Sequence, residues 1–328
     1  MAEKNLLQAI HDGLAEEMRA DETVMVLGED VGRAGGVFRV TQGLHEEFGP
    51  SRVLDTPLAE SLIVGSAIGL SVNGMRPVAE IQFADFILPA FDQILNEAAK
   101  FYYRSNGVWT VPLTIRAPYG AVHGGALYHS QSIEAWFCNT PGLKVVAPTF
   151  PADAKAMLKS AIRDPNPVLF LEHKRTYRLI KEDVTDEGHE VMLDKARLHR
   201  EGGDITVVSY GLMLYTALEV AGKLSDEHGI GAEVVEPRTL YPLDRETILN
   251  SVKKTGKLLV ISEANITGSV SGEIVAIVSA EAFEWLDAPV MRLGAPDTPA
   301  APFARSAMDA FVPSAEKIEA AMLELARY

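Results

Sequence analysis

A single cysteine, Cys138, stands among the 328 residues, so the chain cannot form an internal disulfide. This scarcity fits a reducing compartment, and the apolar surroundings of the thiol in EAWFCNTP favour packing over nucleophilic chemistry. No run reaches the roughly 18 apolar residues of a membrane helix. The first residues, MAEKNLLQAIHDGLAEEM, have the pattern of an amphipathic helix and lack a signal peptide's apolar core and cleavage site. We therefore expect a cytoplasmic protein without a membrane segment.

Basic residues are also fewer than acidic ones: 30 Lys and Arg against 45 Asp and Glu give a net charge of −15. A nucleic-acid binder needs clustered cations against the phosphates, so we expect no nucleic-acid partner. The composition is otherwise that of a globular protein, with 47% hydrophobic and 23% charged residues. The length predicts two domains.

Several catalytic motifs are missing. The eight histidines show no HxH or HExxH spacing, which argues against a zinc site. There is no GxSxG elbow of a serine hydrolase, and GSAIG and GRAGG have the wrong spacing for the GxGxxG of a nicotinamide dehydrogenase. A GDG segment followed at a distance by asparagines is absent as well. The reaction class is therefore not given by these motifs.

Apolar runs typical of strands alternate with helical patterns, which predicts an α/β fold with a parallel sheet covered on both faces. The sequence becomes polar between about Arg178 and Gly203, and the alternation then restarts. We predict a first domain at 1–185, a linker at 186–203 and a smaller second α/β domain at 204–328. The longest predicted helices of the first domain are Lys4–Arg19, a helix that starts near Pro57, and Phe86–Arg104.

One stretch, Val53–Gly74, combines a helix start with a nearly apolar helix. Asp55 or Thr56 is the expected N-cap and Pro57 the expected first helical residue, which places the acid Glu60 in the first turn. A helix that packs on most of its circumference would carry Glu60 into low-dielectric surroundings, where an acid needs a partner or a role. Glu60 could equally stabilise the helix N-terminus as a carboxylate.

Other candidate site residues lie at or after the ends of predicted strands. Glu29 follows the strand VMVLG, and Gln82 and Phe86 lie at the exit of RPVAEIQF. His129 lies in a glycine-containing loop after the next strand, among small residues. Open α/β sheets bind ligands at the carboxyl ends of their strands. Two carboxylates, a histidine and an aromatic there make acid–base chemistry plausible and leave the reaction open.

A resemblance to a known family narrows the choice of reaction. The ordered blocks that carry it are LGEDVGRAGGVFRVT, RVLDTPLAE, AEIQFADF, FDQILNEAAK, HSQSIEAWF, PGLKVV, SAIRDPNPVLFLEHKRTYR and PLDRETILNSVKKTGK. From about Asn5 to the C-terminus the chain resembles the β subunit of 2-oxo acid dehydrogenase complexes, the thiamine-diphosphate-dependent decarboxylase component of branched-chain or pyruvate type. The resemblance implies a pyrimidine-binding domain followed by a transketolase C-terminal-like domain.

The resemblance also assigns roles. The family's DTPLxE pattern places the catalytic glutamate at Glu60, which is implied to bond N1′ of the cofactor's aminopyrimidine. A glutamate can keep and return that proton only where burial disfavours its charged form, and we expect the apolar helix start to provide this burial. The other implied pocket residues are Glu29, Leu58, Gln82 and Phe86, with Phe86 stacked on the pyrimidine where some relatives have tyrosine.

His129 matches the family's HSQS histidine, which faces the reacting centre and is assigned to the substrate carboxylate or to reductive acylation of lipoyl. The family also has a structural potassium site. Its matching positions are Leu113, Thr114, Ala161, Asp164 and Asn166.

The resemblance implies partners. The missing GDG segment is expected on a separate α subunit that supplies the magnesium-diphosphate site, in a heterotetramer of two α and two β chains. Large apolar surfaces are then expected on the first domain. The C-terminal domain is expected to dock the basic peripheral-subunit-binding domain of the lipoyl acyltransferase core, with Asp287 and the terminal carboxylate as candidate contacts.

Some features leave alternatives open. EPRTLYPLD stands where the family commonly has DLRTLxPLD, and Ile266–Glu273 lacks a basic residue that many relatives carry, which bears on assembly of the C-terminal domain. A branched 2-oxo acid is the expected substrate, which would place the chain in branched-chain amino acid catabolism. Pyruvate or acetoin are the alternatives, because EAWF after HSQSI also occurs in pyruvate enzymes. A non-catalytic assembly subunit is the alternative from a different class.

Overall fold

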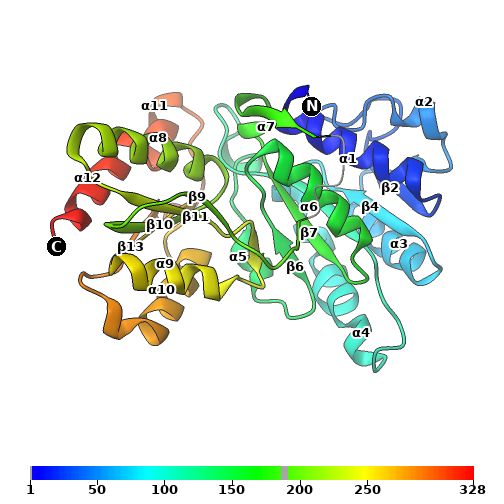
Figure 1. Cartoon of the computed structure of the whole chain (residues 1–328). Coiled ribbons are helices and arrows are strands. Elements are labelled where there is room, and N and C mark those ends of the chain that lie inside the picture. The colour runs from blue at the N-terminus through cyan, green and yellow to red at the C-terminus, as the bar shows by residue number, and fades with distance from the viewer. Residues whose placement is uncertain (1, 186–190) are drawn as a thin grey trace. The chain divides into compact units, whose positions relative to one another are not determined.

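The computed structural model of the chain describes residues 2–185 and 191–328. The chain forms two compact units, one of residues 1–119 and 136–193 and the other of residues 120–135 and 194–328. Each unit is an α/β structure with helices packed on a mainly parallel sheet (Figure 1). The units change over inside the predicted linker 186–203, of which residues 186–190 lie outside the described residues. Residues 197–200 of that linker form a strand of the second sheet.

The first unit is built on six strands that lie side by side in the order β3-β2-β4-β5-β7-β6, and every hydrogen-bonded pair among them is parallel. The strands are β2 (Val24–Gly28), β3 (Val53–Asp55), β4 (Arg76–Glu80), β5 (Thr114–Tyr119), β6 (Lys144–Val146) and β7 (Val168–His173). All side chains of β2, β5 and β7 are buried, as the continuous apolar runs in the sequence predict for a sheet covered on both faces.

Helices α1 (Leu6–Ala20) and α6 (Pro151–Arg163) pack against each other in this unit. Leu6, Ile10 and Leu14 of α1 are fully buried at helical spacing. The helix begins two residues later than predicted, because the Asn5 and Gln8 side chains cap each other's backbone N–H groups. The remaining elements are β1 (Ala2–Asn5), which pairs antiparallel with β8 (Lys181–Val184), and the short helices α2 (Leu44–Phe48) and α7 (Thr176–Leu179). Helix α5 (Glu134–Cys138) begins in the second unit and continues into the first.

Helix α3 spans Glu60–Val72, so the predicted start at Pro57 after an Asp55 or Thr56 cap is wrong. Thr56 instead extends the pairing with β2, since its N–H donates to the carbonyl of Gly28. The Asp55 carboxylate accepts a hydrogen bond from the Gly32 N–H at 2.6 Å and is not available as a cap.

The predicted helix Phe86–Arg104 is helical without a break from Leu88 to Arg104, but it is not a regular α-helix. After a 3₁₀ turn at Ala84–Phe86, it runs through 3₁₀ turns at Leu88–Ala90 and Ala98–Lys100, a π-helical turn at Gln93–Glu97 and helix α4 (Phe101–Arg104). Pro89 has no N–H to donate to a helical ladder, which disfavours a regular start. Ile94 and Ala98 are buried as their spacing predicts.

The sheet of the second unit has the order β14-β13-β10-β11-β9, parallel except for the antiparallel pair β11–β9. Its strands are β9 (Arg197–Arg200), β10 (Ile205–Ser209), β11 (Ala232–Glu236), β13 (Leu258–Asn265) and β14 (Met291–Ala295), and β12 (Thr239–Tyr241) follows β11 in the chain. The helices are α8 (Gly211–His228), α9 (Arg245–Thr255), α10 (Val270–Glu281), α11 (Arg305–Phe311) and α12 (Ala315–Ala326), with a 3₁₀ turn at Phe283–Trp285. The predicted restart of the α/β alternation is confirmed.

Within residues 2–185 and 191–328, no helix has the length and apolarity needed to cross a membrane.

Candidate active site

Two candidate acids and a glutamine of the first unit follow the carboxyl ends of three neighbouring strands. In the register of the sheet, Gly28 of β2 lies level with Asp55 of β3 and with Glu80 of β4. Glu29 is therefore the first residue beyond β2, and Gln82 lies just beyond β4. Glu60 begins α3, five residues after β3. The structure thus brings three of the predicted side chains to one edge of the sheet.

Glu60 stands in the first turn of α3, and the helix has Ala59 at its N-cap with no side-chain capping bond. Among the described residues, no hydrogen bond or ion pair involves the Glu60 carboxylate. The side chain is half-buried, and the neighbouring Leu58 is 71% exposed. The expected burial of Glu60 is thus not supplied by this chain alone, since Ser61, Leu62 and Ser66 of α3 are exposed as well.

Glu29 is coupled to Glu60 by charge. Partial burial raises the pKa of the Glu29 carboxyl, and the negative charges of Asp30 and Glu60 add to the rise. A raised pKa favours the protonated form of the Glu29 carboxyl, so this acid can hold a proton beside the start of α3.

Aromatic rings follow Gln82 in the chain. The rings of Phe86 and Phe83 meet edge to face with centroids 5.7 Å apart, and Phe83 meets Phe38 at 5.4 Å. The ammonium group of Lys174 lies 5.8 Å from the centre of the Phe83 ring. Gln82 donates from Nε2 to Oδ2 of Asp30 at 3.4 Å. Phe86 is half-buried, so part of its side chain remains accessible.

A glycine-containing loop after Glu29 folds back on the strand ends. The N–H of Gly36 donates to the carbonyl of Asp30, and Gly36 has a φ of 77°. A Cβ at Gly36 would lie 3.1 Å from Oε1 of Glu80, so this position requires glycine for both its conformation and its close approach. On α1 the loop is held by His11, whose Nδ1 lies 2.8 Å from the carbonyl oxygen of Val40.

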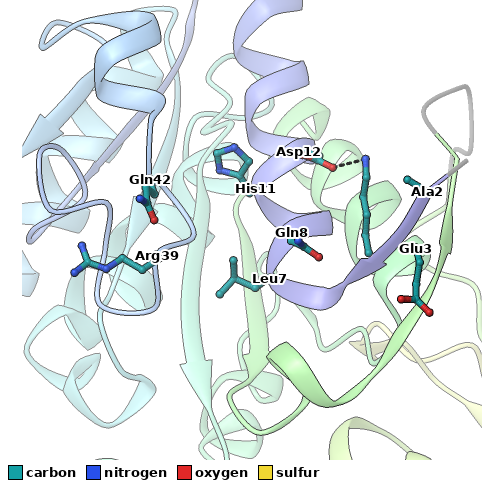
Figure 2. A pocket seen from close by; sticks show the side chains of 9 residues that line it. Ala2, Glu3, Leu7, Gln8, His11, Asp12, Arg39 and Gln42 are labelled. Atoms are coloured by element: carbon teal, nitrogen blue, oxygen red, sulfur yellow. Dashed lines mark ion pairs between the residues drawn. The ribbon is translucent and has the colours of Figure 1, made fainter.

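A hollow of about 480 Å³ is formed by residues of β1, α1 and this loop, and Figure 2 shows the side chains that line it. None of the residues predicted for the site lines it. The lining residues are Ala2, Glu3, Lys4, Leu7, Gln8, His11, Asp12, Arg39 and Gln42. The candidate site is thus not this hollow.

A buried ionic network beneath the strand ends was missed from the sequence. The guanidinium of Arg116 donates to both carboxylate oxygens of Glu172, at 2.6 and 2.8 Å, and to Oε2 of Glu80 at 2.6 Å. The hydroxyl of Tyr177 donates to Glu172 at 2.5 Å. Burial raises the pKa of Glu80, and Glu172 adds to the rise while Arg116 opposes it. The signal in the sequence was an arginine inside the apolar run LTIRAP.

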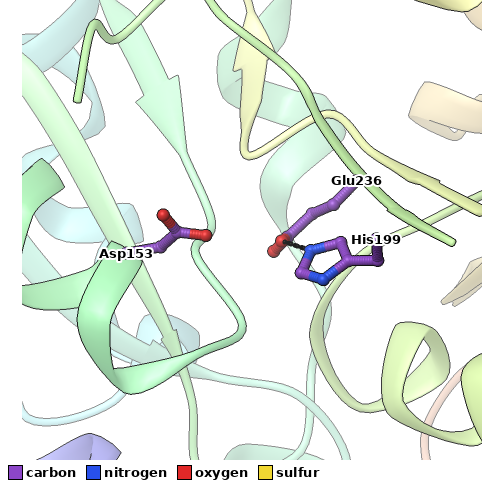
Figure 3. Close-up of side chains that lie close together, drawn as sticks. All are labelled: Asp153, His199 and Glu236. Atoms are coloured by element: carbon purple, nitrogen blue, oxygen red, sulfur yellow. Dashed lines mark hydrogen bonds and ion pairs between the residues drawn. The ribbon is translucent and has the colours of Figure 1, made fainter. Parts of the chain in front are cut away.

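His129 follows the 3₁₀ turn Ala126–Tyr128 and belongs to residues 120–135 of the second unit. It is half-buried. In the same unit the half-buried His199 of β9 and the buried Glu236 of β11 lie 2.7 Å apart between Nε2 and Oε2 (Figure 3). No sequence motif singled out this pair.

The positions predicted for potassium all belong to the first unit. Leu113 and Thr114 lie at the start of β5, which pairs with β7, and Ala161, Asp164 and Asn166 lie at the end of α6 and in the turn that leads to β7. The hydroxyl of Thr114 is buried without a hydrogen-bond partner among the described residues, as an ion ligand would be. The Asp164 carboxylate is engaged by Lys144 at 2.8 Å and by the Asn166 N–H at 2.9 Å.

Two family descriptions match the chain in order. Residues 2–180 match the transketolase pyrimidine-binding domain, and residues 194–318 match the transketolase C-terminal domain. A solved structure described as a split-gene transketolase, inactive β4 tetramer, superposes with a TM-score of 0.80 at 25% identity, over 99% of this chain and 98% of its own. The fold and the two domains therefore define a transketolase-type chain.

Comparison with individual proteins indicates a narrower family within this class. The 2-oxoisovalerate dehydrogenase subunit beta of Bacillus subtilis is 53% identical over the full length of both chains. The pyruvate dehydrogenase E1 component subunit beta of the same organism is 48% identical, over 91% of each chain. The chain belongs to the family of 2-oxo acid dehydrogenase β subunits, and thiamine diphosphate is the cofactor of that family.

Proposed function

We propose that this chain is the β half of a thiamine-diphosphate-dependent 2-oxo acid dehydrogenase that decarboxylates a branched 2-oxo acid, 3-methyl-2-oxobutanoate, and passes the acyl group to lipoyl. The observation that carries the proposal is the acid pair Glu29 and Glu60, joined by charge at the strand ends in a chain 53% identical to a 2-oxoisovalerate dehydrogenase β subunit. Pyruvate is the second candidate because the pyruvate relative is nearly as similar, at 48%. Acetoin is a further candidate.

The side chains of the first unit fit the aminopyrimidine of the cofactor. The Glu60 carboxylate has no competing partner among the described residues and can bond N1′, and the neighbouring Glu29 has a pKa raised by burial and by the charges of Asp30 and Glu60. The partly exposed ring of Phe86 offers a stacking surface, and Leu58 and Gln82 offer an apolar and an amide contact. When bound, thiamine diphosphate supplies a carbon nucleophile that accepts the acyl group.

Glu60 and His129 have separate proposed roles in the reaction. Glu60 holds a proton at N1′ and takes it back during turnover, which general acid–base chemistry permits where water is excluded. Since Leu58 and Leu62 are 71% and 50% exposed here, a partner has to exclude that water. His129 is proposed to bind the substrate carboxylate or to assist transfer to lipoyl.

The proposed partner is an α subunit that carries the magnesium and diphosphate contacts, in a tetramer of two α and two β chains. Large apolar side chains exposed close together in the chain on the first unit support such a partner, because exposed apolar patches mark interaction sites. Leu58 lies two residues before α3 and Leu62 lies in its first turn, and Tyr103, Val108 and Trp109 lie in and after α4, where Tyr103 is 89% exposed.

The proposal has three further parts, each supported by one observation. Potassium is proposed at Leu113, Thr114, Ala161, Asp164 and Asn166 because the buried Thr114 hydroxyl lacks a partner. Docking to the lipoyl acyltransferase core is proposed through Asp287 and the terminal carboxylate, with Asp287 exposed next to the exposed Trp285. A cytoplasmic location is proposed from the lone cysteine.

The test is co-expression with a candidate α chain, followed by assay of a panel of 2-oxo acids and acetoin. We expect turnover only in the complex and fastest with branched substrates. Glu60→Gln should abolish turnover while the complex still assembles, and Glu22→Gln, a change at an exposed acid, is the matched control. Full turnover by the Glu60→Gln complex would refute the role of Glu60. A complex that assembles but turns over no substrate would favour an assembly subunit.

A further inference from the structure

Glu134 lies at the end of the segment that carries His129, and the mechanism above does not use it. It is the first residue of α5 and is fully buried. Its Oε1 accepts a hydrogen bond from the Tyr210 hydroxyl at 2.7 Å, and Tyr210 is the N-cap residue of α8. Its Oε2 is buried without a hydrogen-bond partner among the described residues. A buried carboxylate oxygen without a donor is costly if it is charged and tolerable if it carries a proton.

A second acid holds the other end of the same segment. Glu263 of β13 is 5% exposed, and its Oε1 accepts a hydrogen bond from the N–H of Ala121. Between the two anchors, the Gly120 N–H donates to the carbonyl of Gln131 at 3.0 Å and closes the segment into a loop. Residues 120–135, here called the His129 segment, are thus fixed to the second unit at both ends by carboxylates.

The two acids are close enough to repel each other. Burial raises the pKa of Glu134 to about 7, and the charge of Glu263 adds to the rise, while hydrogen bonds from Tyr210 and from the backbone amide of Glu134 itself oppose it. Tyr210 and Glu263 are the titratable groups that face Glu134 from α8 and β13 within the second unit.

We propose that Glu134 is a positioning residue for His129, which fixes the His129 segment to α8 while it carries a proton and loosens that segment when the proton leaves. The neutral acid fits its buried position beside Glu263. The ionised acid would stand against a like charge with one oxygen unpaired, and movement of the segment that admits water relieves this cost. His129, five residues before Glu134, would move with it. The consequence for catalysis rests on the proposed function of His129.

The first experiment uses the chain itself. Trp136 lies two residues beyond Glu134 in α5, and replacing Trp109 and Trp285 by phenylalanine leaves it as the only indole. We expect its emission to titrate with a midpoint near pH 7 and to lose this transition in Glu134→Gln. Glu273→Gln, at an exposed acid of α10, should leave the midpoint unchanged. A transition that persists in Glu134→Gln would overturn the proposal.

Two neighbouring substitutions should move the midpoint in opposite directions. Tyr210→Phe removes a donor that favours the charged form and should raise the midpoint, whereas Glu263→Gln removes a repelling charge and should lower it. The reverse order would overturn the proposal. A midpoint that shifts when potassium replaces tetramethylammonium at equal ionic strength would also overturn it, because a bound cation would then hold the acids together.

The second experiment uses the reconstituted complex with an α subunit. The turnover number of the unsubstituted complex should fall about tenfold from its plateau by one pH unit above the midpoint, as one ionisation requires. The Glu134→Gln complex should vary less than about twofold over the same range. Equal pH profiles would overturn the proposal. A complex without any turnover would count against the proposed function, and the Trp136 titration would then decide on Glu134 alone.

Discussion

The substitution Glu134→Gln should make the chain relatively more stable as the pH rises, and the size of the effect follows from burial. The carboxyl of Glu134 has a pKa of about 7 in the folded chain, against an ordinary value of 4.5 when exposed. Between these values the folded state holds a proton that the unfolded state has lost. The free energy of unfolding therefore falls as the pH rises from 4.5 to 7, by about 1.4 kcal/mol per unit, and this group's contribution is flat above 7.

Integrated between pH 5 and pH 8, this group costs the unsubstituted chain about 2.5 kcal/mol. Glutamine has the same shape and no ionisation, so the difference in unfolding free energy between Glu134→Gln and the unsubstituted chain should increase by about 2.5 kcal/mol over that range. Urea unfolding can be followed by the emission of Trp285 in a Trp109→Phe, Trp136→Phe background, which reports on the second unit. A difference that changes by less than about 0.5 kcal/mol would refute the reasoning, since Glu134 would then be ionised in the folded chain already at pH 5.

Three further outcomes are expected. Arg116→Met should lower the unfolding free energy by about 3–5 kcal/mol in thermal or urea unfolding, because it leaves Glu80 and Glu172 buried without their cation, while Arg116→Lys should cost less; equal losses would contradict this. Leu62→Asp on the exposed start of α3 should prevent co-purification with an α subunit, whereas Leu198→Asp on β9 should not, and retention of the α subunit by Leu62→Asp would place the interface elsewhere. Potassium should raise the melting temperature above its value in tetramethylammonium, and Thr114→Val should remove that increment if the buried hydroxyl is a ligand.

The positions of residues at strand ends could be predicted because each buried parallel strand is a short apolar run whose end is visible in the sequence. The apolar runs before Glu29 and Gln82 are strands β2 and β4, and parallel neighbours bring their carboxyl ends to one edge. The restart of the alternation after the polar stretch likewise indicated a second α/β unit. These features depend on local pattern, which a single sequence contains.

Features that depend on distant partners could not be predicted. The neighbours of Asp55 in the sequence predict that it is an N-cap. In the fold its carboxylate accepts a hydrogen bond from the Gly32 N–H, and α3 begins five residues later. The helical period of Phe86–Arg104 continues through turns of three different kinds, because its apolar residues are buried whether the ladder is regular or not. Arg116 is fully buried only because Glu80 and Glu172 approach it from two other strands.

The apolar start of α3 and the tip after α4 also have a consequence before any cofactor binds. A chain that leaves Tyr103 and Leu58 in water is attractive to chaperones and proteases that recognise exposed apolar side chains. An excess of this chain over its partner would therefore be removed faster than the assembled complex, and the cell would match the two subunits by degradation as well as by synthesis. The surface proposed to join the subunits would then also set their ratio.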